Sequence, residues 1–356
     1  MKNLPSAPQW ETPLLKPHGL GDLNKFGRRT ARRDLIEAID GVSVHELVEA
    51  YGSPVFVTSE RRLRENIRKI RRAFDSRWPD VVHGWSYKTN YTTAICNILH
   101  QEGSIAEVVS GFEYDKARHN GVAGHDIIFN GPNKKRVQLE RAIDEGAMIH
   151  VDHFDELALI GDIASERRQN VRLALRLTFD TGFTEAWSRF GFHLESGQAH
   201  EAARRIAAHP YLQLHGLHSH IGTFILDPRA YESQVKIMCG FMREVEAGQD
   251  HLIDYIDIGG GLPSRNALQG VYQPPQQAVP DLDDYAEAIC GALARETQYR
   301  LDAGQKRPRL IFESGRAVVD DAQSLIASVC GLKMLPDGRR SAILDAGVNV
   351  LISARN

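Results

Sequence analysis

The chain has 356 residues and is nearly neutral, because 43 Lys and Arg residues stand against 46 Asp and Glu residues and leave a formal charge of −3. This balance does not indicate a nucleic-acid partner or an anionic membrane surface, and no apolar run approaches the roughly 20 residues that span a bilayer. The cysteines are far apart in the sequence and lack metal-ligand spacing, which fits reduced thiols. We therefore expect a cytoplasmic protein that binds neither nucleic acid nor a membrane and holds no metal.

Residues 1–52 are predicted to form an N-terminal extension that could contribute to a β domain elsewhere in the fold. Within it, Ser43 and Glu46 have the spacing of a capping box and predict the start of a helix. A strand over Pro54–Thr58 and a helix over Ser59–Phe74 follow, the helix with apolar residues at helical spacing. The many arginines of this helix could bind an acidic partner, but the interleaved glutamates favour a solvated face.

Short apolar runs then alternate with segments of helical pattern. The runs predicted as strands are Val81–Tyr87, Ile105–Val109, Ile127–Phe129, Met148–Val151, Val171–Leu177, Leu212–Leu217, Ile253–Ile258 and Leu310–Phe312. Helical pattern is found in Lys134–Glu145, Phe154–Ile163, Ala199–Ala207, Tyr231–Glu246 and Leu282–Gln298. About eight strands alternating with helices indicate a (β/α)8 barrel, whose active site lies at the carboxyl ends of the strands. Two connections are long, Phe179–Glu195 and Pro263–Asp281, and the second is expected to be irregular.

Lys88 ends the first of these barrel strands, at the point where Thr89 and Asn90 are expected to open a helix. A lysine held near desolvating or cationic neighbours loses its proton more readily and can form a Schiff base with an aldehyde such as pyridoxal phosphate. The alternative is an ordinary surface lysine at the start of a loop. The other strand ends bear on this choice.

Residues that could serve a site follow most of the predicted strands. They are Lys88, Ser110, Asn130, Asp152, His220, Gly259–Gly261, Glu313, Gly315 and Arg316. Three consecutive glycines allow backbone N–H groups to approach a phosphate closely, although a tight turn would also explain them. The loops after the seventh and eighth strands of such barrels commonly hold phosphate. Since Arg316 lies just beyond the eighth strand, the pattern favours a phosphate site.

His218 and His220 alternate along a strand, so their side chains should point to the same face while that of His215 points away. Such a pair could bind a divalent metal, as in metal-dependent barrel hydrolases of the amidohydrolase type. That alternative is weakened because no further His and Asp residues stand at obvious ligand positions. His220 could instead lie flat against an aromatic cofactor ring, or be a hydrogen-bonded core histidine.

Six ordered motifs resemble those of the fold-type III pyridoxal-phosphate decarboxylases, the family of diaminopimelate and ornithine decarboxylases. They are Trp85–Asn90, Val108–Glu113, Ser188–Gly191, His218–Thr223, Asp257–Gly261 and Glu313–Arg316. The resemblance runs from about Gly52 to Asn349 and is closest in wording to diaminopimelate decarboxylase. It implies a barrel of the alanine racemase-like type with pyridoxal 5′-phosphate as cofactor.

The resemblance assigns catalytic roles to Lys88, His220 and Glu313. Lys88 matches the lysine that forms the Schiff base, and His220 matches the histidine that stacks on the pyridine ring. Glu313 matches the carboxylate that keeps the ring nitrogen protonated, so that the ring can accept the electron pair released in decarboxylation. The related alanine racemases have an arginine there, so Glu313 favours decarboxylation over racemisation.

The remaining cofactor-binding residues implied by the resemblance surround the phosphate or lie close to it. They are Ser110, Thr223, Gly259, Gly260, Gly261, Gly315 and Arg316. Thr223 stands where the family usually has a serine and keeps the hydroxyl. Ser314 stands where the family usually has a proline, which should loosen this turn but leave its ligands in place.

We expect three parts: the extension of residues 1–52, the cofactor-binding barrel of residues 53–313, and residues 314–356 as the start of a C-terminal β domain that is incomplete relative to the family. The Cys and Tyr that complete the family's active site across a dimer interface are absent. Ser353 stands where diaminopimelate decarboxylases have an arginine for the distal carboxylate, with Arg355 two residues later. The chain is therefore expected to be a fragment, to act as a homodimer or with a partner chain that supplies this segment, or to be a non-catalytic homologue that only binds the cofactor. The expected substrate is a diaminopimelate-like or basic amino acid such as lysine or ornithine.

Overall fold

The structure is a computed structural model that describes residues 36–185, 187–265 and 275–350. The first 35 residues of the N-terminal extension lie outside these residues, as do Ser353 and Arg355. Among the described residues, no helix is long and apolar enough to cross a membrane.

Eight parallel strands form a closed barrel. In the order of their pairing they are β10 (Leu212–His218), β11 (Tyr255–Asp257), β12 (Arg309–Phe312), β4 (Val81–Ser86), β5 (Ile105–Val108), β6 (Ile127–Phe129), β7 (Met148–Val151) and β8 (Val171–Thr178). The pairing of β8 with β10 closes the ring. The predicted (β/α)8 barrel is therefore confirmed, and the bounds of its strands differ from the predicted ones by at most two residues at either end.

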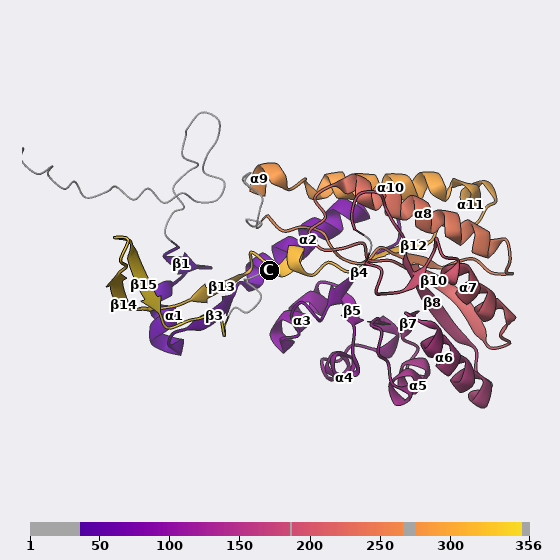
Figure 1. The fold of residues 1–356 in the computed structure, drawn as a ribbon, viewed down its shortest axis with the longest axis horizontal. Coiled ribbons are helices and arrows are strands. Elements are labelled where there is room, and N and C mark those ends of the chain that lie inside the picture. Colours follow the sequence, from indigo (N-terminus) through magenta and orange to yellow (C-terminus); the bar gives the residue numbers. More distant parts are fainter. Residues whose placement is uncertain (1–35, 186, 266–274, 351–356) are drawn as a thin grey trace, which may run out of the picture.

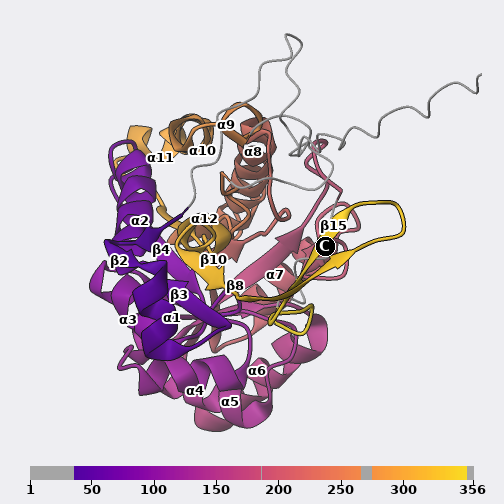
Figure 2. The same cartoon turned by 90° about the vertical axis from the view of Figure 1, so that its left-hand side faces the viewer.

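Helices surround this barrel (Figure 2). Those that lie between or beside the strands are α2 (Glu60–Asp75), α3 (Thr93–Gln101), α4 (Gly111–His119), α5 (Arg136–Asp144), α6 (Phe154–Arg167), α7 (Gln198–Ala208), α8 (Pro228–Glu246), α10 (Leu282–Glu296), α11 (Gln298–Asp302) and α12 (Arg316–Val319). The helix expected to open at Thr89 and Asn90 begins at Thr93 instead. The reason is local, because the Asn90 side chain accepts the Thr92 backbone N–H and holds the chain in a turn before the helix starts.

The barrel interior is apolar at the bottom and polar toward the carboxyl ends of the strands. Ile128, Ala174, Tyr255 and Ile311 form the lower layer and are nearly or completely buried. Gly216 leaves room for the Tyr255 ring, whose atoms lie within 2.6 Å of the place where a Cβ on that glycine would stand. The interior is thus a packed core below a set of polar side chains, as expected when the active site lies at the upper face.

Most of the remaining strands lie beside the barrel, on the left in Figure 1. Two short strands, β1 (Ala38–Ile39) and β2 (Val42–Ser43), precede helix α1 (Val44–Tyr51). Ser43 and Glu46 form the predicted capping box at the start of this helix. β3 (Val55–Thr58) pairs with β13 (Gln323–Ile326), and β14 (Val329–Met334) pairs with β15 (Arg340–Leu344), both antiparallel.

The two long connections, Phe179–Glu195 and Pro263–Asp281, are described to different extents by the structure. The first contains an additional strand, β9 (Phe192–His193), which pairs with the last two residues of β8. The second contains the short helix α9 (Pro275–Ala278), and the residues before that helix, 266–274, lie outside the described part of the chain.

Candidate active site

The polar residues at the carboxyl ends of β4, β5, β6 and β12 are joined by an unbroken chain of hydrogen bonds. Lys88 Nζ donates to Glu107 Oε2 at 2.7 Å. The Asn130 amide donates to Glu107 Oε1 at 3.0 Å and to Glu313 Oε1 at 2.6 Å. Ser86 Oγ adds a further bond to Glu107 Oε2 at 2.6 Å. The predicted lysine and the predicted glutamate therefore share one site, linked by two residues to which sequence analysis gave no role.

The charge of Lys88 is set mainly by its acidic neighbours. Its side chain is 47% exposed at the mouth of the barrel, whereas that of Glu107 is completely buried. Desolvation of the amine lowers the pKa of Lys88, but the attraction of Glu107, and after it of Glu313, outweighs this and raises the pKa above its usual value. This differs from the sequence-based expectation of an amine that loses its proton easily. Glu107 is the reason, and it is also the group to which the proton can pass.

His220 lies just beyond β10 as a neutral, firmly held ring. Its Nδ1 accepts the Gly260 backbone N–H at 3.0 Å, and the Trp187 ring meets it edge to face with centroids 5.1 Å apart. Burial, and next the positive charge of Lys88, lower the pKa of His220 to about 3. The ring is therefore uncharged at neutral pH, as a stacking surface for an aromatic cofactor should be.

The triple glycine forms the start of the loop after β11 and lies against the loops after β10 and β12. At each glycine, an added Cβ would come too close to an atom of these two loops. A Cβ on Gly259 would stand 2.8 Å from His220 Cβ, one on Gly260 would stand 2.6 Å from the Glu313 carbonyl oxygen, and one on Gly261 would stand 2.4 Å from the Gly222 carbonyl oxygen. Gly259 and Gly261 also have φ values of 68° and 99°, which favour glycine. The Glu313 N–H donates to the Gly259 carbonyl at 2.8 Å. The glycines therefore bring the loops after β10, β11 and β12 together.

The other predicted phosphate-binding residues lie on these loops or beside them. Thr223 is exposed directly after Gly222, and the Arg316 guanidinium lies 5.1 Å from the centroid of the Phe224 ring. Gly315 faces Thr89, whose Oγ1 would lie 2.1 Å from an added Cβ, so the loop after β12 packs against the loop that carries Lys88.

Ser110 has a structural contact of its own. It is the N-cap of α4, where its Oγ accepts the Glu113 N–H at 3.3 Å. The structure thus gives Ser110 a helix-capping role and gives the loops after β10 and β12 a common position around the triple glycine.

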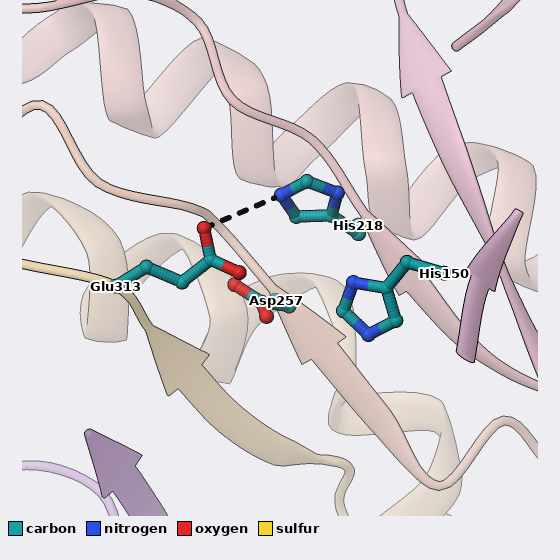
Figure 3. A group of neighbouring side chains, drawn as sticks. All are labelled: His150, His218, Asp257 and Glu313. Carbon is teal, nitrogen blue, oxygen red and sulfur yellow. Dashed lines mark ion pairs between the residues drawn. The ribbon is translucent and has the colours of Figure 1, made fainter. Parts of the chain in front are cut away.

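Three further buried side chains, His150, His218 and Asp257, converge on Glu313 (Figure 3). Each of these four residues offers one ligand atom, and these atoms lie within 4.8 Å of one another. Imidazole and carboxylate would suit zinc. However, ligand atoms on a tetrahedral zinc ion lie only about 3.5 Å apart, so this group is wider than a formed metal site. The predicted pair of His218 and His220 does not converge on these atoms, since His220 contacts the glycine loop instead.

Comparisons with known proteins assign this barrel to a family. The family described as "Pyridoxal-dependent decarboxylase, pyridoxal binding domain" matches residues 61–320. The chain belongs to this family. Among relatives of the decarboxylase, the diaminopimelate decarboxylase of Methanothermobacter thermautotrophicus is 30% identical over 323 residues, which cover 88% of this chain and 71% of the relative. The diaminopimelate decarboxylase of Aquifex aeolicus is 30% identical over 327 residues, which again cover 88% of this chain and 71% of the relative.

Solved structures agree with this assignment. A diaminopimelate decarboxylase from M. jannaschii superimposes with a TM-score of 0.78 at 27% identity, over 88% of this chain and 72% of that one. The same enzyme in co-complex with L-lysine gives a TM-score of 0.76 over the same shares, again at 27% identity. The predicted family, the alanine racemase-like barrel and the class of enzyme, a pyridoxal-dependent amino-acid decarboxylase, are confirmed. Nothing in these relatives favours the metal-dependent hydrolase.

Glu107 is the residue of this decarboxylase site that sequence analysis missed. It lies in the middle of the predicted strand Ile105–Val109, whereas Asn130 was listed among the residues that could serve a site but was given no specific role. A charged residue within an apolar strand run is a usable signal, because it must face either a partner or a site.

Proposed function

We propose that this decarboxylase binds pyridoxal 5′-phosphate through Lys88, His220, Glu313 and the triple glycine, and that it removes a carboxylate from diaminopimelate or from a basic amino acid such as lysine or ornithine. The observation that carries the proposal is the hydrogen-bonded chain from Lys88 through Glu107 and Asn130 to Glu313, together with the bond from the Glu313 N–H to the triple glycine. It brings an amine, an acid and the triple glycine to one mouth of the barrel. Diaminopimelate is favoured by the names of the relatives and by the complex of one such enzyme with L-lysine, because lysine is what remains when diaminopimelate loses one carboxylate.

The described residues fit the proposed cofactor. The glycine loop lies so close to its neighbours that any Cβ would collide. Two of its N–H groups are donated within the protein, that of Gly259 to Asp257 and that of Gly260 to His220, so the Gly261 N–H is the group of this loop that would meet a phosphate. Thr223 and Arg316 lie on the two neighbouring loops and could add a hydroxyl and a positive charge. Neutral His220 supplies a flat surface for the ring, and Glu313 supplies a buried carboxylate for the ring nitrogen.

When bound, pyridoxal phosphate supplies an aldehyde that takes the substrate amine and a ring that accepts the electron pair freed from the carboxylate bond. The chain's own residues prepare this chemistry. Lys88 Nζ must give up a proton before it can bond to carbon, and Glu107 Oε2, at 2.7 Å, is placed to receive that proton. Glu313 would favour a proton on the ring nitrogen, because its carboxylate is buried and is oriented by the bond from Asn130.

The experiment is reconstitution of the purified protein with pyridoxal phosphate, followed by absorption spectra before and after borohydride and a screen for carbon dioxide release. We expect a coloured protein whose cofactor becomes covalently attached on reduction, with turnover of diaminopimelate, lysine or ornithine. Lys88→Ala should abolish both the attachment and turnover. Attachment at another lysine would refute the role of Lys88, and colour without turnover of any amino acid would leave a cofactor-binding protein in place of an enzyme.

We also propose the division into parts and the oligomeric state. Residues 53–313 would form the cofactor-binding unit, and residues 1–52 and 314–356 would belong to a β unit. The hairpin β14–β15 exposes apolar side chains, with Leu332 75% and Met334 60% exposed, and such a surface favours contact with a second chain. A homodimer in analytical ultracentrifugation would support this proposal, and a monomer at micromolar concentration would oppose it.

A further inference from the structure

The carboxylates of Asp257 and Glu313 form a buried pair, and His218 Nε2 lies 3.7 Å from Glu313 Oε2 (Figure 3). Asp257 is 0% and Glu313 4% exposed, and their side chains face each other from β11 and the end of β12 (Figure 3). Each has one oxygen already engaged, since Asp257 Oδ1 accepts the Gly259 N–H at 2.8 Å and Glu313 Oε1 accepts from Asn130 at 2.6 Å. Among the described residues, Asp257 Oδ2 has no hydrogen-bond donor.

The charged groups around this pair are committed elsewhere or are neutral. Lys88 is bonded to Glu107 at 2.7 Å, and Arg176 lies 3.6 Å from Asp152. His150 and His218 flank the two carboxylates, and burial lowers the pKa of each ring well below its usual value, so both are uncharged at neutral pH. Two ionised carboxylates in such a place would repel each other and would both be desolvated, which is strongly unfavourable.

We infer that Asp257 carries a proton on Oδ2 and donates it in a hydrogen bond to Glu313, so that the two acids together hold a single negative charge on Glu313. Asp257 is then a positioning residue for the proposed decarboxylase chemistry. Its hydrogen bond and the one from the Asn130 amide together hold the Glu313 carboxylate in place. The positioning role of Asp257 rests on the proposed function. The protonation of Asp257 does not, and it can be tested without cofactor or substrate.

Two observations place the proton on Asp257 and not on Glu313. Glu313 Oε1 accepts a short bond from the Asn130 amide, and a carboxylate accepts such a bond more strongly than a carboxylic acid does. Asp257 lies deeper, and desolvation followed by the charge of Glu313 raises its pKa well above the usual range. The free oxygen of Asp257 also becomes a donor once protonated, which removes an unpartnered acceptor from the interior.

The decisive measurement is infrared spectroscopy on the cofactor-free protein at neutral pH. A protonated buried carboxylic acid gives a carbonyl stretch, shifted in D2O, that no carboxylate gives. We expect this band in the wild type, its loss in Asp257→Asn, and its retention in the control Asp254→Asn. Asp254 is a suitable control because it lies three residues earlier, is paired with Arg172 and His215, and has its pKa lowered, first by the His215 hydrogen bond.

A band that is absent from the wild type would overturn the inference. So would a band that survives in Asp257→Asn and disappears in Glu313→Gln, or a stoichiometric metal ion in the purified protein that is lost in Asp257→Asn. Because no cofactor or substrate is present, these outcomes are independent of whether the protein decarboxylates anything.

A second readout tests the positioning role in the loaded protein. Asn keeps a neutral donor opposite Glu313 and an acceptor for the Gly259 N–H, whereas Ala keeps neither. We expect Asp257→Ala to weaken pyridoxal phosphate binding roughly tenfold or more and Asp257→Asn to restore most of it. Equal losses in the two variants would show that a neutral donor opposite Glu313 contributes nothing, and would refute the inference.

Discussion

Replacing Asn130 with Ala tests the hydrogen-bonded chain at its central link. The Asn130 side chain is 2% exposed and donates to two carboxylates, to Glu313 at 2.6 Å and to Glu107 at 3.0 Å. A hydrogen bond to a charged group contributes about 1.5–3 kcal/mol. Removing both would therefore cost about 3–6 kcal/mol, and we take the lower value because water can enter the space that Ala leaves.

Since 1.4 kcal/mol corresponds to a factor of ten, a loss of about 3 kcal/mol predicts a fall in kcat/KM of roughly a hundredfold. The assay is steady-state carbon dioxide release, run beside a titration of the apoprotein with pyridoxal phosphate. Asn130→Asp, which has nearly the size of Asn, should be worse than Ala because it adds a third negative charge between Glu107 and Glu313.

Asn120→Ala is the matched control. The Asn120 amide donates to the neutral Tyr87 hydroxyl at 3.1 Å, outside the chain of carboxylates. Its loss should lower the melting temperature slightly and leave kcat/KM near the wild-type value. An Asn130→Ala enzyme within threefold of wild type, or an Asn130→Asp enzyme as active as wild type, would refute the role assigned to this bridge.

Three further predictions concern the cradle and the buried charges. Gly260→Ala should abolish pyridoxal phosphate binding in a fluorescence titration, because its Cβ would stand 2.6 Å from the backbone oxygen of Glu313. Lys134→Met should lower the free energy of unfolding by about 3–5 kcal/mol in urea, since it leaves the Glu156 carboxylate, 2.7 Å from Lys134 Nζ, buried without its partner. Burial lowers the pKa of His83 from 6.5 to about 4, so the wild type should lose about 3 kcal/mol more stability than His83→Gln as the pH falls from 6.5 to 4.

The sign of the last prediction follows from linkage. The folded state disfavours protonated His83, so the full stability is present above pH 6.5 and is lost as the unfolded chain takes up the proton first. Equal acid sensitivity of His83→Gln and wild type would contradict this prediction.

For Gly260→Ala, the control is Gly248→Ala, because a Cβ on Gly248 would meet only the Val245 carbonyl oxygen at 3.6 Å. For the lysine, a Lys134→Met, Glu156→Gln double variant should recover part of the lost stability.

The barrel could be predicted from sequence because its strands are short apolar runs between helices with one apolar face. The apolar runs of the strands and the helical spacing of apolar residues are local properties of the chain. Each strand buries its own apolar run, and Ile127–Phe129 is buried completely. Lys88 and Glu313 could be placed at one face for the same reason, since parallel strands end at the same edge.

The polar interior could not be predicted in the same way. Glu107 and Asp257 stand inside strand runs, and their partners come from other strands through the closure of the ring. The raised pKa of Lys88 likewise depends on Glu107, which is 19 residues away in the sequence. Turn geometry was also missed at Asn90, where one side-chain hydrogen bond delays the start of α3. Contacts of this kind depend on register and barrel closure, which the hydrophobic pattern does not determine.

The sharing of Glu107 and Asn130 between Lys88 and Glu313 means that these positions should not vary independently. A substitution at either bridging residue alters the electrostatic environment of both ends, so double-mutant cycles between Glu107 and Glu313 should show strong epistasis. Descendants of this sequence that change one member would be expected to acquire compensating changes at the others, and engineered libraries that sample the four sites singly would miss the functional combinations.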